Sequence, residues 1–274
     1  MTAAADATRA ALASGVDVRE LTQLAEFTRT VELFDEIWRP TIQPISAELL
    51  RAFSKAGNYV AGAYDGTGLV AASAGFFSAP AEVTLHSHIA GVSGAGTAGR
   101  HIGWALKLHQ RAWALDRGVA YVDWTFDPLV ARNAYFNIVK LGGLPAEYLP
   151  NFYGDMADGI NGDDDSDRLL LRWELASPRA NAACAGHFQP APLEGVVGLG
   201  RDDRGGPVRG PTDADTVLVA VPRDVEALRL KDSGAAKEWR IAVREVLGGL
   251  LAGGARVSGF ARDGWYVVRR AEAA

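Results

Sequence analysis

Two helical patterns occupy the first part of the chain. Over residues 24–38, apolar side chains recur every three or four positions, so they fall on one face of a helix. These side chains are Leu24, Phe27, Val31, Phe34 and Trp38. Ser46 is a typical N-cap residue, and it precedes a shorter helical pattern that ends near Gly57. Residues 16–19 alternate between apolar and polar and predict a short strand before both helices.

Three strand-like runs follow the two helices. They cover residues 59–64, 69–78 and 83–92. The sequence Asp65-Gly66-Thr67-Gly68 joins the first two runs and is typical of a hairpin turn. After the third run the pattern changes, because residues 93–99 are all small and precede a helical pattern over residues 100–117. Gly118 is a suitable C-cap for that helix.

The remaining patterns continue the alternation of strands and helices. They predict strands over residues 120–126, 148–153 and 169–175, and a helix over residues 129–141. The order of the elements predicts an α/β fold of the α+β kind. In this fold a mixed, mainly antiparallel central sheet is flanked by helices and contains one strand–helix–strand crossover.

The composition divides the chain of 274 residues into four parts. Residues 1–15 are rich in alanine and are expected to form a flexible leader, and residues 16–176 form the main domain. Residues 177–213 are rich in Pro, Gly, Asp and Arg without periodicity, which is typical of a linker or irregular loop. Residues 214–274 return to a strand, helix and hairpin pattern. This predicts a small C-terminal α/β subdomain that acts as a lid or as a packing or dimer element.

The overall composition is that of a globular protein, with 48% hydrophobic and 22% charged residues. A net charge of −5 argues against a nucleic-acid partner. No apolar stretch approaches the ~18 residues that a membrane span needs, and the N-terminus lacks the basic start of a secretory signal. Cys184 is the only cysteine, which excludes an internal disulfide and a cysteine zinc cluster. These features predict a cytoplasmic location.

The run of small residues before the third predicted helix is a candidate anion site. Backbone amides of small residues can approach an anion closely, and the first turn of a helix favours negative charge. Arg100 could add a direct phosphate contact, and His101 a weaker one. No Gly-Lys-Ser/Thr follows, so this is not a Walker loop. The run also follows several antiparallel-looking strands, which disfavours a Rossmann fingerprint. A plain connection is the alternative interpretation.

The stretch Ala98-Gly99-Arg100-His101-Ile102-Gly103 resembles the diagnostic motif of the GNAT superfamily of N-acyltransferases, [Arg/Gln]-x-x-Gly-x-[Gly/Ala] after the fourth strand. Ala98 and His101 depart from the usual residues. The order of elements resembles that fold over residues 16–175. The resemblance implies that main-chain amides of the loop hold the coenzyme A pyrophosphate, and that the preceding strand splays from its neighbour so that pantetheine pairs with its edge. The residues implied are Ala90, Val92, Gly99, Arg100, His101, Ile102 and Gly103.

A second block, RNAYFNIVKLGG, resembles the fourth helix of the same superfamily. The resemblance implies that Asn133 bonds the pantetheine arm and that Phe136 lines its channel. A polar residue at a helix start and a core aromatic residue are the alternative interpretations. In many members, a tyrosine four residues before the closing glycine protonates the leaving thiolate. Ile138 stands at that position here, and Tyr135, one turn earlier, is the nearest substitute.

Further segments, among them SHIAGV, DWTFDPLVARNAYFN and NFYGDM, resemble a bacterial subgroup of the superfamily that has a C-terminal extension. Some of its members are associated with N-succinylamino-acid racemases and acylate D-amino acids. This resemblance implies acetyl-CoA or succinyl-CoA as the cosubstrate and the amine of a small molecule, such as an amino acid, as the acceptor. A homodimer is compatible with the sequence.

The strand-like run over residues 83–92 carries two candidates for the general base that the reaction needs. Strict alternation would place His86, His88, Ala90 and Val92 on one face. A neutral imidazole is suited to accept the proton of an amine near pH 7. A core histidine is the alternative interpretation. Two histidines without a nearby carboxylate are a weak metal signal, so no metal is expected.

Two carboxylates flank the end of the fifth strand. Asp123 and Asp127 are candidate ligands for a substrate ammonium group, and Asp127 is also a candidate helix cap before Pro128. The sequence as a whole predicts an acyl-CoA-dependent N-acyltransferase that works by direct attack of the amine. Because the usual tyrosine is missing, an inactive acyl-CoA-binding sensor is the alternative. A nucleotide-binding oxidoreductase is disfavoured by the late position of the glycine turn.

Overall fold

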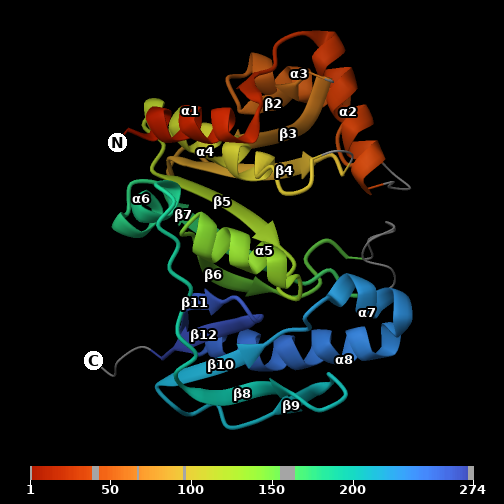
Figure 1. Ribbon diagram of the computed structural model, residues 1–274, viewed down its shortest axis with the longest axis vertical. Coiled ribbons are helices and arrows are strands. Elements are labelled where there is room, and N and C mark those ends of the chain that lie inside the picture. Colours follow the sequence, from red (N-terminus) through yellow and green to blue (C-terminus); the bar gives the residue numbers. More distant parts are fainter. Residues whose placement is uncertain (1, 39–42, 67, 95–96, 155–163, 271–274) are drawn as a thin grey trace. The chain divides into compact units, whose positions relative to one another are not determined.

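The computed structural model describes residues 2–38, 43–66, 68–94, 97–154 and 164–270 (Figure 1). The chain forms two compact units. The first unit consists of Met1–Trp124 and Glu174–Ala185, and the second of Thr125–Trp173 and Gly186–Ala274. The division therefore falls at the end of β5 and not after residue 176, where the composition placed it. The second part of the expected main domain belongs to the same unit as the C-terminal residues.

The first sheet has the strand order β1-β2-β3-β4-β5-β7-β6. Its first five strands are β1 (Asp17–Glu20), β2 (Val60–Asp65), β3 (Gly68–Phe77), β4 (Thr84–Val92) and β5 (Tyr121–Phe126). β1 to β4 pair antiparallel in chain order, whereas β5 pairs parallel with β4 after the crossover helix α4 (Ile102–Asp116). The predicted mixed, mainly antiparallel sheet flanked by helices is confirmed.

Helices cover both faces of the strands in the first unit (Figure 1). α2 (Leu24–Trp38) and α3 (Ala47–Lys55) bury their apolar stripes on one face. The core beneath them includes Leu21, Phe27, Leu33, Phe34, Leu50 and Val60. α4 lies on the other face, where the hydroxyl of Tyr59 is 3.0 Å from Nδ1 of His109. The three helices that we predicted from the apolar periodicity of this part of the chain are therefore confirmed.

Residues 3–14 form helix α1 (Ala3–Ser14) in place of the flexible leader that we expected. Thr2 caps the helix by accepting from the amide of Ala5, and Gly15 ends it with a φ of 63°. Alanine has the highest helix propensity, and both caps are of the preferred kinds. The helix packs along α4 (Figure 1). Packing and capping together therefore give a helical structure to a segment whose composition alone did not predict one.

The second unit contains strands of both sheets. β6 (Leu144–Leu149) and β7 (Arg168–Glu174) pair antiparallel. A further sheet has the order β11-β12-β10-β8-β9. Its strands are β8 (Val196–Arg201), β9 (Pro207–Arg209), β10 (Thr216–Ala220), β11 (Arg256–Ala261) and β12 (Trp265–Arg269). The helical segments of the unit are α5 (Ala131–Tyr135), η1 (Phe136–Lys140), α7 (Val225–Lys231), α8 (Ser233–Val243), η2 (Arg244–Gly248) and α9 (Gly249–Ala252). The predicted C-terminal α/β extension is confirmed.

Residues 177–213 are partly regular, which corrects the expected linker. Ser177 caps helix α6 (Pro178–Cys184), which has proline at its first position, as helices favour. β8 pairs parallel with β10 and antiparallel with β9. Glycines interrupt β8 and β9 has only three residues, so neither strand shows the alternation by which strands are recognised.

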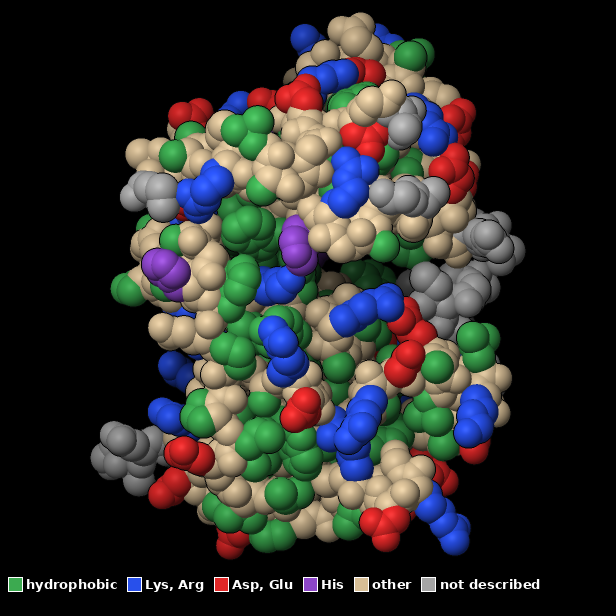
Figure 2. Space-filling view, in the orientation of Figure 1, with side chains coloured by type: hydrophobic (Ala, Val, Ile, Leu, Met, Phe, Trp, Pro, Cys, Tyr) green, Lys and Arg blue, Asp and Glu red, His purple; other side chains and the backbone are tan. Residues whose placement is uncertain are grey.

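On the face drawn in Figure 2, basic and acidic side chains are mixed over the surface. This agrees with the small net charge of −5. Within the part of the chain that the structure describes, none of the helices has both the length and the apolar character that a bilayer crossing requires.

Candidate active site

β4 extends beyond its register with β5. The register of their parallel pairing joins Thr84–His86 to Tyr121–Asp123. β4 nevertheless continues to Val92, with β3 as its partner on the other side. Its edge toward β5 therefore carries main-chain N–H and C=O groups that a ligand with amide groups could pair with.

The turn after β4 leads into the N-terminus of α4. Gly99 has a φ of 76°, a conformation that glycine adopts without strain. His101 also has a positive φ of 58°, which costs a non-glycine residue on the order of 1 kcal/mol. The first intrahelical bonds run to the carbonyl of His101 from Trp104 and Ala105. The amides of Ile102 and Gly103 thus belong to the first turn, where N–H groups have no intrahelical acceptor and attract anions.

Arg100 has partners within the first unit in place of the expected phosphate contact. Its Nη1 donates to Asp65 at 2.7 Å. Its Nε and Nη2 donate to the carbonyl of Ser14 at 3.3 Å, and Nη2 also donates to that of Gly15 at 3.1 Å. The guanidinium thus connects the C-terminal end of α1 to the β2–β3 turn. In this arrangement Arg100 supports the segment before α4, and the main-chain amides of that segment remain the candidate anion site.

We expect Arg100→Ala to lower the free energy of unfolding by about 1 kcal/mol, because the ion pair with Asp65 is only partly buried. Urea denaturation measures this change. Coenzyme A affinity, measured by calorimetric titration, should change little. Arg29→Ala is the control, since the ion pairs of Arg29 with Glu32 and Glu36 are exposed. A large loss of affinity at unchanged stability would contradict the structural role of Arg100.

A β-bulge divides the four β4 residues that strict alternation places together. The register with β3 shifts between the pairs Ala74–Ile89 and Gly75–Ser87, which leaves His88 as the extra residue. Before the bulge, the rings of His86 and His88 both contact Phe76, whose other neighbour is Phe53 of α3. The two histidines therefore lie on the α2/α3 face.

Beyond the bulge, the faces are exchanged. A Cβ atom on Gly91 would meet Ile37 and Trp38 of α2, whereas a Cβ atom on Gly103 of α4 would lie 3.4 Å from Cγ2 of Val92. Alternation then puts Ala90 on the α4 face together with Val92. The prediction that all four residues share a face is wrong. The structure instead separates Ala90 and Val92, which lie beside the turn before α4, from the histidines on the opposite face.

The two histidines have an environment that keeps them neutral near pH 7. Their ring centroids are 6.2 Å apart, at 5.1 Å (His86) and 5.8 Å (His88) from Phe76. Burial lowers the pKa of His88 below its usual value, and burial and the neighbouring His88 do the same for His86, against an opposing effect of Asp123. Asp123 is buried and pairs in register with His86. Such imidazoles are ready to accept a proton.

Lys107 is a site residue that the sequence reasoning missed. Its Nζ donates to Oγ of Ser87 at 2.8 Å and to Oε1 of Gln110 at 3.0 Å, and lies 3.9 Å from the ring centroid of Trp124. Burial lowers the pKa of Lys107 to about 7. The amino group thus lies beside Ser87, the first residue of β4 beyond the register with β5. The signal in the sequence was a second stripe of α4, with Gly103, Lys107 and Gln110 at helical spacing.

The other candidate residues lie on α5 and η1 in the second unit. Asn133 is exposed, and Tyr135 and Phe136 are half-buried. The hydroxyl of Tyr135 is 3.4 Å from Nη2 of Arg262, which donates to it. Ile138, where many superfamily members have tyrosine, is fully buried. The helix changes to π geometry from Phe136 onward, a feature that is frequent at functional sites.

Asp127 is committed to ion pairs, which corrects its assignment as a ligand of the substrate ammonium. Its two oxygens accept from Nη1 and Nη2 of Arg240 at 2.9 Å each, and Oδ2 accepts from Arg229 at 2.7 Å. Oδ1 also accepts from the amide of Leu129, so the alternative role in the turn before α5 is observed. Burial alone would raise the pKa of Asp127, but Arg240 and Arg229 hold it well below its usual range.

Further contacts from the C-terminal extension converge on the same segment, residues 127–135. The hydroxyl of Tyr266 donates to the carbonyl of Pro128 at 2.8 Å, and Arg132 pairs with Glu226. A Cβ atom on Gly264 would lie 3.6 Å from Ala131, so the β11–β12 turn packs on the first turn of α5. The extension therefore braces the β5–α5 junction and with it the helix of Asn133 and Tyr135.

No protein-family model matches the chain, and no curated protein matches it. Solved structures are similar to it at low identity. One is yncA from Salmonella typhimurium, solved with its cofactor acetyl-CoA (15% identity, TM-score 0.47, covering 61% of this chain and 99% of that one). Another is a GNAT-family protein from Desulfovibrio desulfuricans (13%, 0.46, 59% and 99%). A third is an N-acetyltransferase from Staphylococcus aureus Mu50 (13%, 0.48, 58% and 98%). Likenesses of this size do not assign a function.

Proposed function

We propose that this protein is an acyl-CoA-dependent N-acyltransferase of the GNAT type. It transfers an acetyl or succinyl group to the amine of a small molecule, with an amino acid as the acceptor class. The observation that carries the proposal is that β4 extends to Val92, beyond its register with β5, and that a turn with positive φ at Gly99 and His101 then leads into α4. A strand edge and a helix N-terminus in this order suit the amide-containing and phosphate-containing parts of coenzyme A.

The α4 face of β4 is the proposed cofactor side. The open edge of β4 from Ser87 to Val92 would pair with the pantetheine amides, and the amides of Ile102 and Gly103 would bind the pyrophosphate. Ala90 and Val92 lie on this face, next to the start of α4. Asn133 and Phe136 remain proposed contacts of the pantetheine arm, on the strength of the sequence resemblance.

The α2/α3 face is the proposed acceptor side, and His88 is the proposed general base. The amine nitrogen attacks the thioester carbonyl carbon, the C–S bond breaks, and the amine proton passes to neutral His88. Tyr135 is the proposed donor of the proton that the leaving thiolate takes up. Direct attack is supported by Cys184, because burial raises the pKa of this sole cysteine to about 11 and leaves it a poor nucleophile.

A single substitution at the turn tests the proposal. Gly103→Glu places a carboxylate in the first turn of α4, where it suits the helix dipole but occupies and repels the site of the pyrophosphate. The variant should fold at least as stably as the wild type and lose stabilisation by coenzyme A. For the wild type at 100 times Kd, that stabilisation is about 2.7 kcal/mol. Thermal unfolding with and without coenzyme A measures both quantities.

Gly234→Glu is the matched control, because Gly234 is the second residue of α8 as Gly103 is of α4. It should respond to coenzyme A as the wild type does. Absence of stabilisation in the wild type would refute the proposal. Thiol release from acetyl-CoA and succinyl-CoA, assayed with L- and D-amino acids, tests the reaction itself. Stabilisation by coenzyme A without turnover on any pair would support the sensor instead.

A further inference from the structure

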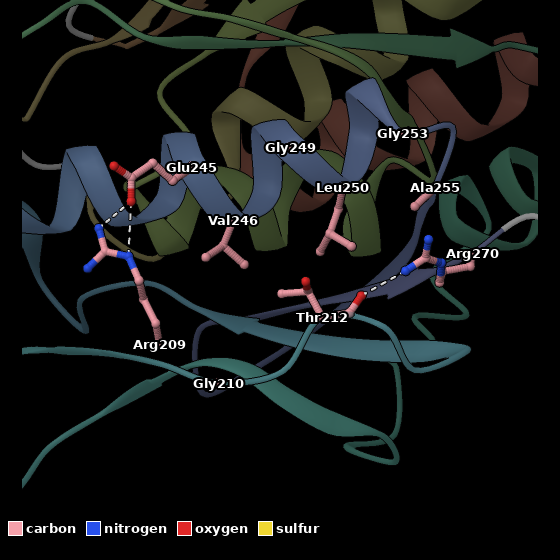
Figure 3. Close-up of a pocket in the computed structure, with 10 residues that line it drawn as sticks. All are labelled: Arg209, Gly210, Thr212, Glu245, Val246, Gly249, Leu250, Gly253, Ala255 and Arg270. Carbon is pink, nitrogen blue, oxygen red and sulfur yellow. Dashed lines mark hydrogen bonds and ion pairs between the residues drawn. The ribbon is translucent and has the colours of Figure 1, made fainter.

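The second unit contains a cavity of about 420 Å³. It lies between the helix formed by η2 and α9 and the segment that follows β9, residues 210–212 (Figure 3). The volume falls within the range of about 300–1,000 Å³ that is usual for small-molecule sites. Every residue that lines it belongs to the second unit, and none is a candidate of the proposed transferase site.

Apolar side chains line the helix side of the cavity, and a glycine leaves space beside them. Val246 and Leu250 point from the helix toward residue 212 (Figure 3). A Cβ atom on Gly249 would meet nothing within 4 Å, although the φ of this residue is an ordinary helical −61°. Glycine within a helix costs about 1 kcal/mol relative to alanine. Close packing does not require glycine at this position, and its effect is to keep the cavity open beside Leu250.

The two ends of the cavity differ in charge. At one end Arg209 donates through Nε and Nη2 to Oε2 of Glu245, so this pair is neutral as a whole. At the other end Nη1 of Arg270 donates to the carbonyl of Thr212 at 3.0 Å. Among the residues that the structure describes, this is the only hydrogen bond of the Arg270 side chain. The guanidinium therefore has further N–H donors at the edge of the cavity that no described residue accepts from.

We propose that this cavity binds a small carboxylate with an apolar body. The carboxylate pairs with Arg270, and the apolar part lies over Gly249 against Val246 and Leu250. The helix from Glu245 to Gly253 is about 12 Å long at 1.5 Å per residue, which leaves room for an unbranched body of several carbons. A polyphosphate is disfavoured because the opposite end presents the carboxylate of Glu245, and a cation is disfavoured by Arg270.

Hexanoate is the probe, and the neutral hexanamide, of the same shape, is its control. Each is titrated into the full-length protein, and the amide resonances of Gly249 and Gly253 are followed by NMR. Hexanoate should shift both resonances saturably, and hexanamide should bind about two- to fivefold more weakly, because an ion pair with the exposed Arg270 is lost. Equal affinity for the two probes, or no shift at these glycines, would overturn the proposal.

Two variants complete the test. Gly249→Leu fills the open space in a conformation that suits leucine, so the melting temperature should be equal or higher while the hexanoate response disappears. Arg270 is exposed, so Arg270→Gln should weaken hexanoate about two- to fivefold and leave hexanamide unchanged. Retained hexanoate binding in Gly249→Leu would also overturn the proposal. None of these measurements uses acyl-CoA or turnover, so the outcome is independent of the proposed function.

Discussion

Replacing Arg240 with methionine is expected to lower the free energy of unfolding of the second unit by about 3–5 kcal/mol at pH 7. Arg240 is 2% exposed and pairs with both Asp127 and Asp164. Removing the guanidinium leaves two buried carboxylates that share Arg229 as their remaining partner in this cluster. Chemical denaturation followed by circular dichroism measures the change.

The cost of this substitution should depend on pH. The folded-state pKa of Asp127 is held below its unfolded value, so the stabilisation is fully present above about pH 4 and is lost as the pH falls further. The difference between wild type and Arg240→Met should therefore shrink in acid. Arg132→Met is the control. Its ion pair with Glu226 also joins the extension to α5 but is exposed, so a loss of only about 0–1 kcal/mol is expected. Equal losses for the two variants would contradict the assignment.

The second large effect concerns the reaction. If His88 is the base, His88→Gln should lower kcat between about 10²- and 10⁴-fold. Coenzyme A affinity should be unchanged, because His88 lies on the α2/α3 face, opposite the face that meets α4. The wild-type rate should fall as the pH drops through the lowered pKa of His88, since only the neutral imidazole accepts a proton. This acid limb should be absent from the variant.

His86→Gln provides the comparison for that assay. His86 is more buried than His88 and lies next to Asp123, so we expect a smaller effect on kcat and a retained acid limb. Steady-state rates from pH 5 to pH 8, with the thiol product measured, separate the two variants. If the large loss and the missing limb belong to His86, the roles of the two histidines are reversed.

The C-terminal extension has a structural role in the second unit, because its contacts support the segment that leads into α5. Arg240, Tyr266 and Gly264 all act on residues 127–131, directly before the helix that carries Asn133 and Tyr135. A lid would contact such a helix only when closed, whereas these contacts are buried. The extension is therefore part of the support of α5, which the composition of the chain did not indicate.

The sequence by itself determined the order of most elements between residues 16 and 142 and the two motifs of the proposed site. Apolar residues at helical spacing predicted helices α2, α3 and α4, and a run of small residues predicted the turn before α4. These signals depend on residues that are near one another in the chain, so they can be read without a partner. α1 could have been recognised in the same way, from Thr2, the alanines and Gly15.

Only the tertiary structure decided which side chains face each other. One extra residue in β4 put His88 on the α2/α3 face and Val92 on the α4 face, and such a bulge exists only relative to the pairing of β3. Asp127 meets Arg240 across 113 residues of sequence, and Arg100 meets Asp65 across 35. Buried charges require partners, but the choice of partner is made by the packing of distant segments, which local sequence does not encode.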